Sequence, residues 1–116
     1  MNLIRLQQDQ HPRPLHHEIR QKRVLDSGYR SIGQVENLYV DEDMELHFVD
    51  VATRGFMGLR TKHHLVPVEA IVSEDASSIT LALDQQAIES APAYAKLQAG
   101  LDDGLQRAIL EHYLPS

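Results

Sequence analysis

The stretch IGQVENLYVDEDMELHFVDV, residues 32–51, decides the fold of this chain. Its first half departs from strict apolar alternation across Glu36 and Asn37, which predicts a β-bulge there. The acidic residues 41–43 predict a hairpin turn, after which Leu46–Val51 runs back as a second strand. Because that second strand is apolar on both faces, we expect a second sheet, a helix or another subunit to cover its outer side.

Further short strands are predicted on both sides of this hairpin. Val24–Leu25 is expected to be a strand that enters a tight turn, where Gly28 would supply a positive φ. Pro67 has no N–H to donate, so its segment belongs at an edge or a bulge of the sheet. Apolar residues alternate cleanly over 79–83, as on a half-buried strand. Five or six short strands joined in sequence favour a mainly β fold, a small antiparallel β-barrel.

The two ends of the chain differ from this strand-rich middle. We expect residues 1–21 to form a basic arm, flexible or docked, residues 22–90 the barrel, and residues 91–116 a helical extension. In the extension, apolar side chains recur at four-residue steps, which places them on one helical face that can cover the two-faced strand. Asp102 or Asp103 can cap this helix. The apolar stripe consists of Leu97, Leu101, Leu105, Ile109 and Tyr113.

Length and composition limit what the chain can be. Its 116 residues make one domain, and 42% hydrophobic with 24% charged residues is a globular balance. The absence of cysteine excludes a disulfide framework and a thiolate zinc site. No apolar run approaches the ~20 residues that cross a bilayer, and the first residues lack the apolar core of a signal peptide. We therefore expect a cytoplasmic protein that does not insert directly into a membrane.

Charge is unevenly distributed along the chain. Residues 1–23 hold five Lys and Arg against two acids, whereas the remaining residues hold six against fifteen. Nucleic acids are bound by clustered Lys and Arg, so an acidic body disfavours them and only the first 23 residues could serve such a partner.

The order and spacing of these segments resemble the PRC-barrel family, named after the photosynthetic reaction centre H subunit. The resemblance covers about residues 22–94. The segment Ala91–Tyr94 at its end looks like a stand-alone form of the family. The family implies a small, highly curved β-barrel. Its members are not known as enzymes and resemble adaptors, in proton delivery near a quinone or in assembly of the small ribosomal subunit. The segments that carry the resemblance are Val24–Gly28, Ile32–Asp41, Gly55–Leu59, Leu65–Ala70 and Ala91–Tyr94.

No residue pattern predicts catalysis, a metal or a cofactor. His63 and His64 are neighbours, and neighbours on a strand point to opposite faces, so the two cannot easily share one metal ion. His47 could still meet one of them across strands, but zinc needs three or four ligands at a fixed geometry, and no spacing here supplies them. The acidic run 41–45 lacks the glycine and glutamate of a calcium loop, which favours a solvated hairpin turn. Phosphate-binding glycine loops, dinucleotide fingerprints and nucleophile elbows are absent. We therefore expect a protein that is not an enzyme and holds no cofactor.

The loop at residues 55–60 is the best candidate for partner recognition. Its apolar apex is flanked by basic residues, the pattern of an interaction patch. The alternative is that Phe56 folds back to plug the open end of the barrel. Residues of this loop and of the two-faced strand together make up the candidate partner contacts. They are Phe56, Met57, Leu59 and Arg60 of the loop and Leu46 and Phe48 of the strand.

Three functional hypotheses follow. The leading one is a non-enzymatic binding or adaptor module for an unidentified protein partner that self-associates as a dimer, because its apolar surface exceeds what a barrel interior requires. The second is an RNA-processing or ribosome-assembly accessory that uses the basic arm. The third is a partner of a membrane electron-transfer complex.

Overall fold

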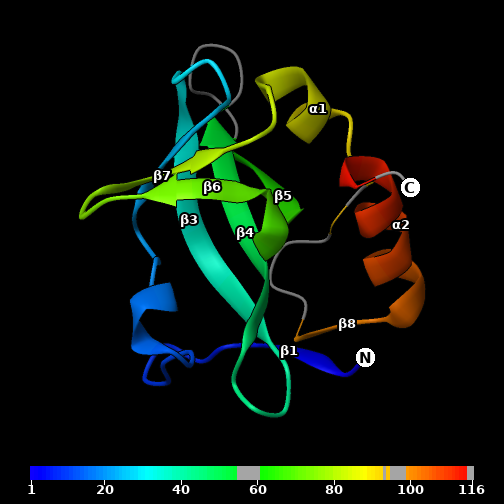
Figure 1. Cartoon of the computed structure of the whole chain (residues 1–116). Helices are drawn as coiled ribbons and strands as arrows, with labels where there is room; N and C mark the ends of the chain where they lie inside the picture. The colour runs from blue at the N-terminus through cyan, green and yellow to red at the C-terminus, as the bar shows by residue number, and fades with distance from the viewer. Residues whose placement is uncertain (55–60, 93, 95–98, 115–116) are drawn as a thin grey trace.

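The structure, a computed structural model, describes residues 1–54, 61–92, 94 and 99–114, and it confirms a mainly β fold (Figure 1). Within these described residues, two helices and two short 3-10 turns accompany the strands. The strands are β1 (Leu3–Arg5), β2 (Arg23–Leu25), β3 (Ser31–Val40), β4 (Leu46–Arg54), β5 (Thr61–Pro67), β6 (Ile71–Glu74), β7 (Ser78–Leu81) and β8 (Gly100–Leu101). The helices are α1 (Gln85–Glu89) and α2 (Asp103–Tyr113), and the 3-10 turns are η1 (Leu15–His17) and η3 (Val68–Ala70).

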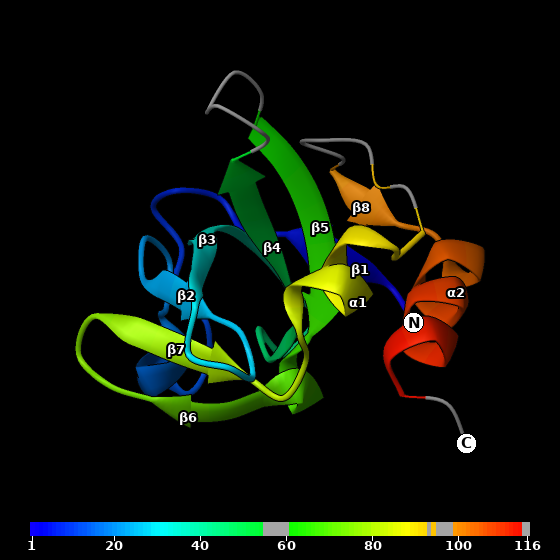
Figure 2. The same cartoon turned by 90° about the horizontal axis from the view of Figure 1, so that it is seen from above.

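Six strands form one curved path in the order β5-β4-β3-β2-β7-β6 (Figures 1 and 2). The pairs along it are antiparallel except β2 with β7, which is parallel and so differs from the expected antiparallel barrel. A parallel pair needs a long crossover, and the chain from β3 to β6 supplies it. The turn η3 joins β5 to β6, but these two end strands do not pair with each other, so the sheet stays open.

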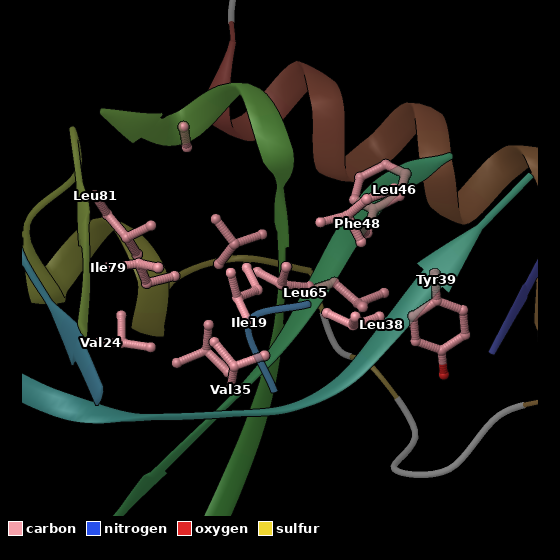
Figure 3. Packing of buried hydrophobic residues seen from close by; sticks show 14 of the residues in the cluster. Ile19, Val24, Val35, Leu38, Tyr39, Leu46, Phe48, Leu65, Ile79 and Leu81 are labelled. Atoms are coloured by element: carbon pink, nitrogen blue, oxygen red, sulfur yellow. The ribbon is translucent and has the colours of Figure 1, made fainter. Parts of the chain in front are cut away.

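The predicted β-bulge is confirmed in the β3–β4 hairpin. Val35 lies opposite Val51 and Leu38 lies opposite Val49, with the irregularity between Val35 and Asn37. Side chains alternate faces along a strand, so residues three apart would normally point to opposite sides. The extra residue removes this conflict and lets both apolar side chains enter one core, which Figure 3 shows. It also turns Asn37 toward the other face.

That other face of the hairpin is covered by the ends of the same chain. β1 pairs with the end of β3, β8 pairs with β1, and α2 packs back against β5 (Figure 1). We call β1, β8 and α2 the covering layer. The helix α2 therefore packs against the sheet at β5, the strand next to the two-faced strand β4. The buried side chains that the layer contributes are Leu3, Leu101, Ile109 and Tyr113.

The helix α2 begins where its cap was expected. Asp102 accepts a hydrogen bond from the Leu105 backbone N–H through Oδ1 at 2.7 Å. Of the predicted stripe, Leu101 lies in β8 before the helix, and Leu97 lies outside the described residues. With 11 residues, α2 is the longest helix of the described chain, short of the ~20 that a membrane-spanning helix needs.

The N-terminal segment packs against the body. Leu6 and Ile19 are buried. The cation Arg20 of this segment forms an ion pair with Glu18. Lys22, just after the segment, forms an ion pair with Glu74 of β6 at 2.8 Å.

The prediction for Gly28 is wrong. Its φ is not positive, and the left-handed residue of this turn is Tyr29, with a φ of 64°. The turn is instead held by the buried Asp26, whose Oδ1 accepts from the backbone N–H groups of Gly28 and Arg30 at 2.9 Å each. A carboxylate that accepts from successive backbone N–H groups stabilises such a turn without glycine.

Candidate functional site

An apolar groove lies beside β6. Its volume is about 240 Å³, enough for one or two aliphatic side chains. Apolar residues from the N-terminal segment, β4, η3 and β6 meet there. The lining residues are His17, Ile19, Leu46, Val68, Ile71, Val72, Ser73 and Glu74.

Val72 stands exposed at the rim of this groove. Its side chain is 61% exposed, which is high for an aliphatic residue on a strand. The cause lies in the register, because Ile71 pairs with Leu81 and Ser73 with Thr80, which leaves Val72 as the extra residue of a bulge. β6 is also an end strand of the path, so its outer edge has no neighbouring strand in the described chain. Apolar surface beside an unpaired edge favours contact with another chain.

Two of the six predicted partner contacts lie in the described chain. Leu46 is 6% exposed and lines the groove. Phe48 is 3% exposed and packs in the core, opposite Tyr39 and Pro67 on the neighbouring strands. The other four, Phe56, Met57, Leu59 and Arg60, lie outside the described residues, so recognition by their loop stays a prediction.

A buried polar cluster lies on the covered face of the hairpin. Asp50 is fully buried, and its carboxylate accepts from Asn37 Nδ2 at 2.8 Å and from His63 Nδ1 at 3.0 Å. Burial raises the pKa of Asp50 above its ordinary value, while these hydrogen bonds oppose the shift. The sequence signal for this cluster was one acid in an apolar run, but its partners could not be identified without the register.

Two tyrosines join the C-terminal segment to the sheet near this cluster. The hydroxyl groups of Tyr39 and Tyr94 are hydrogen-bonded, and the rings meet edge to face with centroids 6.0 Å apart. Burial raises the pKa of both phenols, and the charge of Asp50 adds to the shift. This tyrosine contact holds the segment that follows α1 against β3.

The three histidines of β4 and β5 do not gather at one point. His63 lies opposite Ala52 and His64 opposite Val51, which confirms that the two point to opposite faces. His47 Nε2 lies 2.8 Å from Asp41 instead. No group of three or more His, Asp or Glu side chains suited to a metal ion occurs in the described parts of the chain.

The acidic hairpin turn uses its first carboxylate internally. Asp41 Oδ1 accepts from the backbone N–H of Asp43 at 2.8 Å and of Glu45 at 3.0 Å. The hydrogen bond with His47, together with these two, holds the pKa of Asp41 below its usual value. This is the solvated hairpin turn that the sequence favoured over a calcium loop.

Comparison with known families finds a match for most of the strand-rich part of the chain. A family model described as PRC-barrel domain matches residues 15–86. The matched range contains β2 to β7 and every residue that lines the groove, whereas the covering layer lies outside it. No curated protein matches the chain.

Proposed function

Because this chain belongs to the PRC-barrel family, we propose that it is a non-enzymatic binding module that holds a protein partner at the apolar groove beside β6. One observation carries the proposal: a well-exposed Val72 stands at the edge of an apolar groove on an end strand. Soluble domains rarely leave such a combination without an interaction partner. The predicted contact Leu46 supports the same surface, since it lines the groove.

The partner that fits this surface is a second copy of the chain. A protruding apolar side chain next to an apolar groove is self-complementary, because a twofold axis beside β6 places each Val72 in the groove of the other copy. The unpaired edges of two β6 strands would meet at that axis. The surface is small compared with stable dimer interfaces, which bury roughly 1,200–2,000 Å². We therefore expect a weak dimer, with a dissociation constant in the micromolar range.

The apolar surfaces from which the sequence suggested self-association are buried within the chain. The two-faced strand is covered by the covering layer, and the apolar stripe of α2 is turned inward, where Ile109 and Tyr113 are buried. Only apolar surface left outside this intramolecular packing can bind a partner.

A binding role without catalysis agrees with the state of the Asp50–His63 pair. A carboxylate behind an imidazole is an arrangement that catalytic sites use. Here the His63 side chain is 8% exposed and the carboxylate is fully buried, so a substrate has no access to either.

The RNA hypothesis loses support from the pairing of its cations. Glu18 and Glu74 neutralise Arg20 and Lys22, two of the five bases that were to bind phosphate. Binding to RNA that persists after residues 1–23 are neutralised would point elsewhere on the body.

Sedimentation velocity tests the proposal. We expect the wild-type chain to move from monomer to dimer between about 1 and 100 μM, and Val72→Glu to stay monomeric over that range. Tyr29→Glu is the matched control, because Tyr29 is 75% exposed but lies in the turn between β2 and β3. It should dimerise like the wild type. A wild-type chain that is monomeric throughout, or a Val72→Glu variant that still dimerises, would rule out this interface.

A further inference from the structure

A second cleft, separate from the groove, crosses β2, β3 and β4. Its volume is about 670 Å³, within the 300–1,000 Å³ of typical small-molecule sites. Residues from four strands, two connections and the helix α1 meet in it. The lining residues are Gln21, Arg23, Ser31, Ile32, Gly33, Gln34, Glu36, Ala52, Thr53, Thr61, Ser77 and Gln85.

The cleft is hollow because its floor consists of small residues. Arg23, Gln34, Ala52 and His63 follow one another as cross-strand partners from β2 to β5, so they share one face. Ala52 places a methyl group where its neighbours in this row carry long side chains. Beside it, Gly33 approaches β4 so closely that an added Cβ would lie 2.0 Å from the Ala52 carbonyl oxygen. No larger residue can fill the floor at that position.

The walls are rich in fixed hydrogen-bonding groups. Gln34 Nε2 donates to Gln21 Oε1 at 3.1 Å and to Glu36 Oε1 at 3.3 Å, which orders three side chains along one wall. The hydroxyl groups of Ser31 and Thr61 add donors and acceptors to the lining. Such a surface suits a polar ligand that forms several hydrogen bonds and offers little to an apolar one.

The cleft contains one cation and one anion that are not paired with each other. Arg23 is exposed, and within the described chain its guanidinium forms no hydrogen bond or ion pair. Glu36 is half-buried and accepts from Gln34. Arg23 lies opposite Gln34, and Glu36 is two residues further along β3, so the two are diagonal neighbours about 7–8 Å apart at Cα.

We propose that this cleft binds a small zwitterion that carries one carboxylate and one ammonium group. The guanidinium of Arg23 holds the carboxylate through paired N–H donors, the geometry at which arginine is most selective. Glu36 accepts from the ammonium group, and the amides and hydroxyls of the walls bind the polar atoms between the two charges. Free amino acids and short peptides share this chemistry. A ligand with two carboxylates is disfavoured, because the second would lie near Glu36.

Amide NMR titrations of the ¹⁵N-labelled chain test the proposal with glycine and diglycine as probes. We expect saturable chemical-shift changes of the Gly33, Gln34 and Ala52 amides at millimolar probe concentration. The affinity is low because ligands with so few heavy atoms can form only a few contacts. Acetate and methylammonium each carry one charge, and we expect them to bind at least about 10-fold more weakly. Saturation by glycine identifies free amino acids as the source, and saturation by diglycine alone identifies peptides.

Matched variants separate the site from nonspecific charge effects. Arg23→Gln should weaken zwitterion binding at least about 10-fold. Arg30→Gln should leave it unchanged, since Arg30 is exposed and its side chain likewise has no ion-pair partner in the described chain. Val72→Glu should also leave it unchanged, so that loss of the dimer does not affect this result. The proposal is overturned if neither probe saturates the shifts, or if Arg23→Gln binds both probes as the wild type does.

Discussion

His63 donates from Nδ1 to the Asp50 carboxylate at 3.0 Å from each oxygen, although the two residues are diagonal rather than directly opposite on β5 and β4. Leu65 occupies the position opposite Asp50. The imidazole therefore reaches along the strand to the one buried acid of the hairpin. This diagonal contact makes a polar cluster possible within an otherwise apolar layer.

Asp50→Asn should change how stability depends on pH. Burial raises the pKa of Asp50 above its unfolded value, so the folded chain binds this proton more tightly. The contribution of the group to stability is then present below the unfolded pKa and lost as pH rises through the folded pKa. We expect the wild type to lose stability relative to Asp50→Asn as pH rises above about 4. Urea unfolding at several pH values measures this, and a constant difference between the two proteins would contradict it.

Glu18→Gln should show the opposite pH dependence. The hydrogen bond from Arg20 lowers the pKa of Glu18 to about 2, so its contribution is present above the unfolded pKa and lost as pH falls toward 2. The side chain is 26% exposed, and with solvent screening we expect a loss of about 1 kcal/mol at pH 7. The difference from wild type in the free energy of unfolding should narrow between pH 4.5 and 2. An equal loss at every pH would show that the charge is not involved.

Gly33→Ala should destabilise the chain by at least about 3 kcal/mol. The new Cβ would meet the Ala52 carbonyl oxygen at 2.0 Å, and only separation of β3 from β4 can relieve the clash. Gly28→Ala is the matched control, because its Cβ would meet Asp26 Oδ1 at an ordinary 3.5 Å. We expect it to change stability by less than about 1 kcal/mol, since φ is not positive there. Thermal unfolding compares the two, and equal effects would refute the close approach.

Asp102→Ala should lower stability by about 1 kcal/mol by removing the cap of α2. Asp103→Ala is the control one residue later. Its carboxylate pairs with the exposed amine of Met1, with 74% of the Asp103 side chain in solvent, and such pairs contribute little. Urea midpoints rank the two variants. If Asp103→Ala proved the more damaging, the N-terminal amine would matter more than the cap.

Local patterns predicted the parts of the fold that depend on nearest neighbours. The bulge after Val35 and the cap at Asp102 are visible in the sequence because each changes a short-range period or a single turn. Strands as short as β1 and β8 show no alternation of apolar and polar residues that could be detected. The β1–β8 pair also joins residues almost a chain length apart, such as Leu3 and Leu101. Both strands of the parallel β2–β7 pair were expected, but their pairing joins residues as far apart in the sequence as Val24 and Ile79, which no local pattern reveals. The helix α1 was also missed, although Asp84 caps it by accepting from the Ala87 N–H at 2.8 Å.

The candidate site was predicted only in part. Leu46 was singled out because it belongs to the strand that is apolar on both faces, and it does line the groove. Val72 was missed, because one valine in a polar segment carries no pattern, and only the register reveals it as a bulged residue. The Asp50–His63 contact needed the same register information.

The covering layer sets an order of events for a chain made from its N-terminus. β1 can find β3 as soon as residue 40 has emerged, but its other neighbour, β8, is synthesised sixty residues later. Until then, Leu3 lacks its partner Leu101 of β8. A nascent or prematurely terminated chain that stops after α1 therefore exposes apolar sheet surface that is buried once β8 and α2 have folded. Chaperones and proteases can bind this exposed surface.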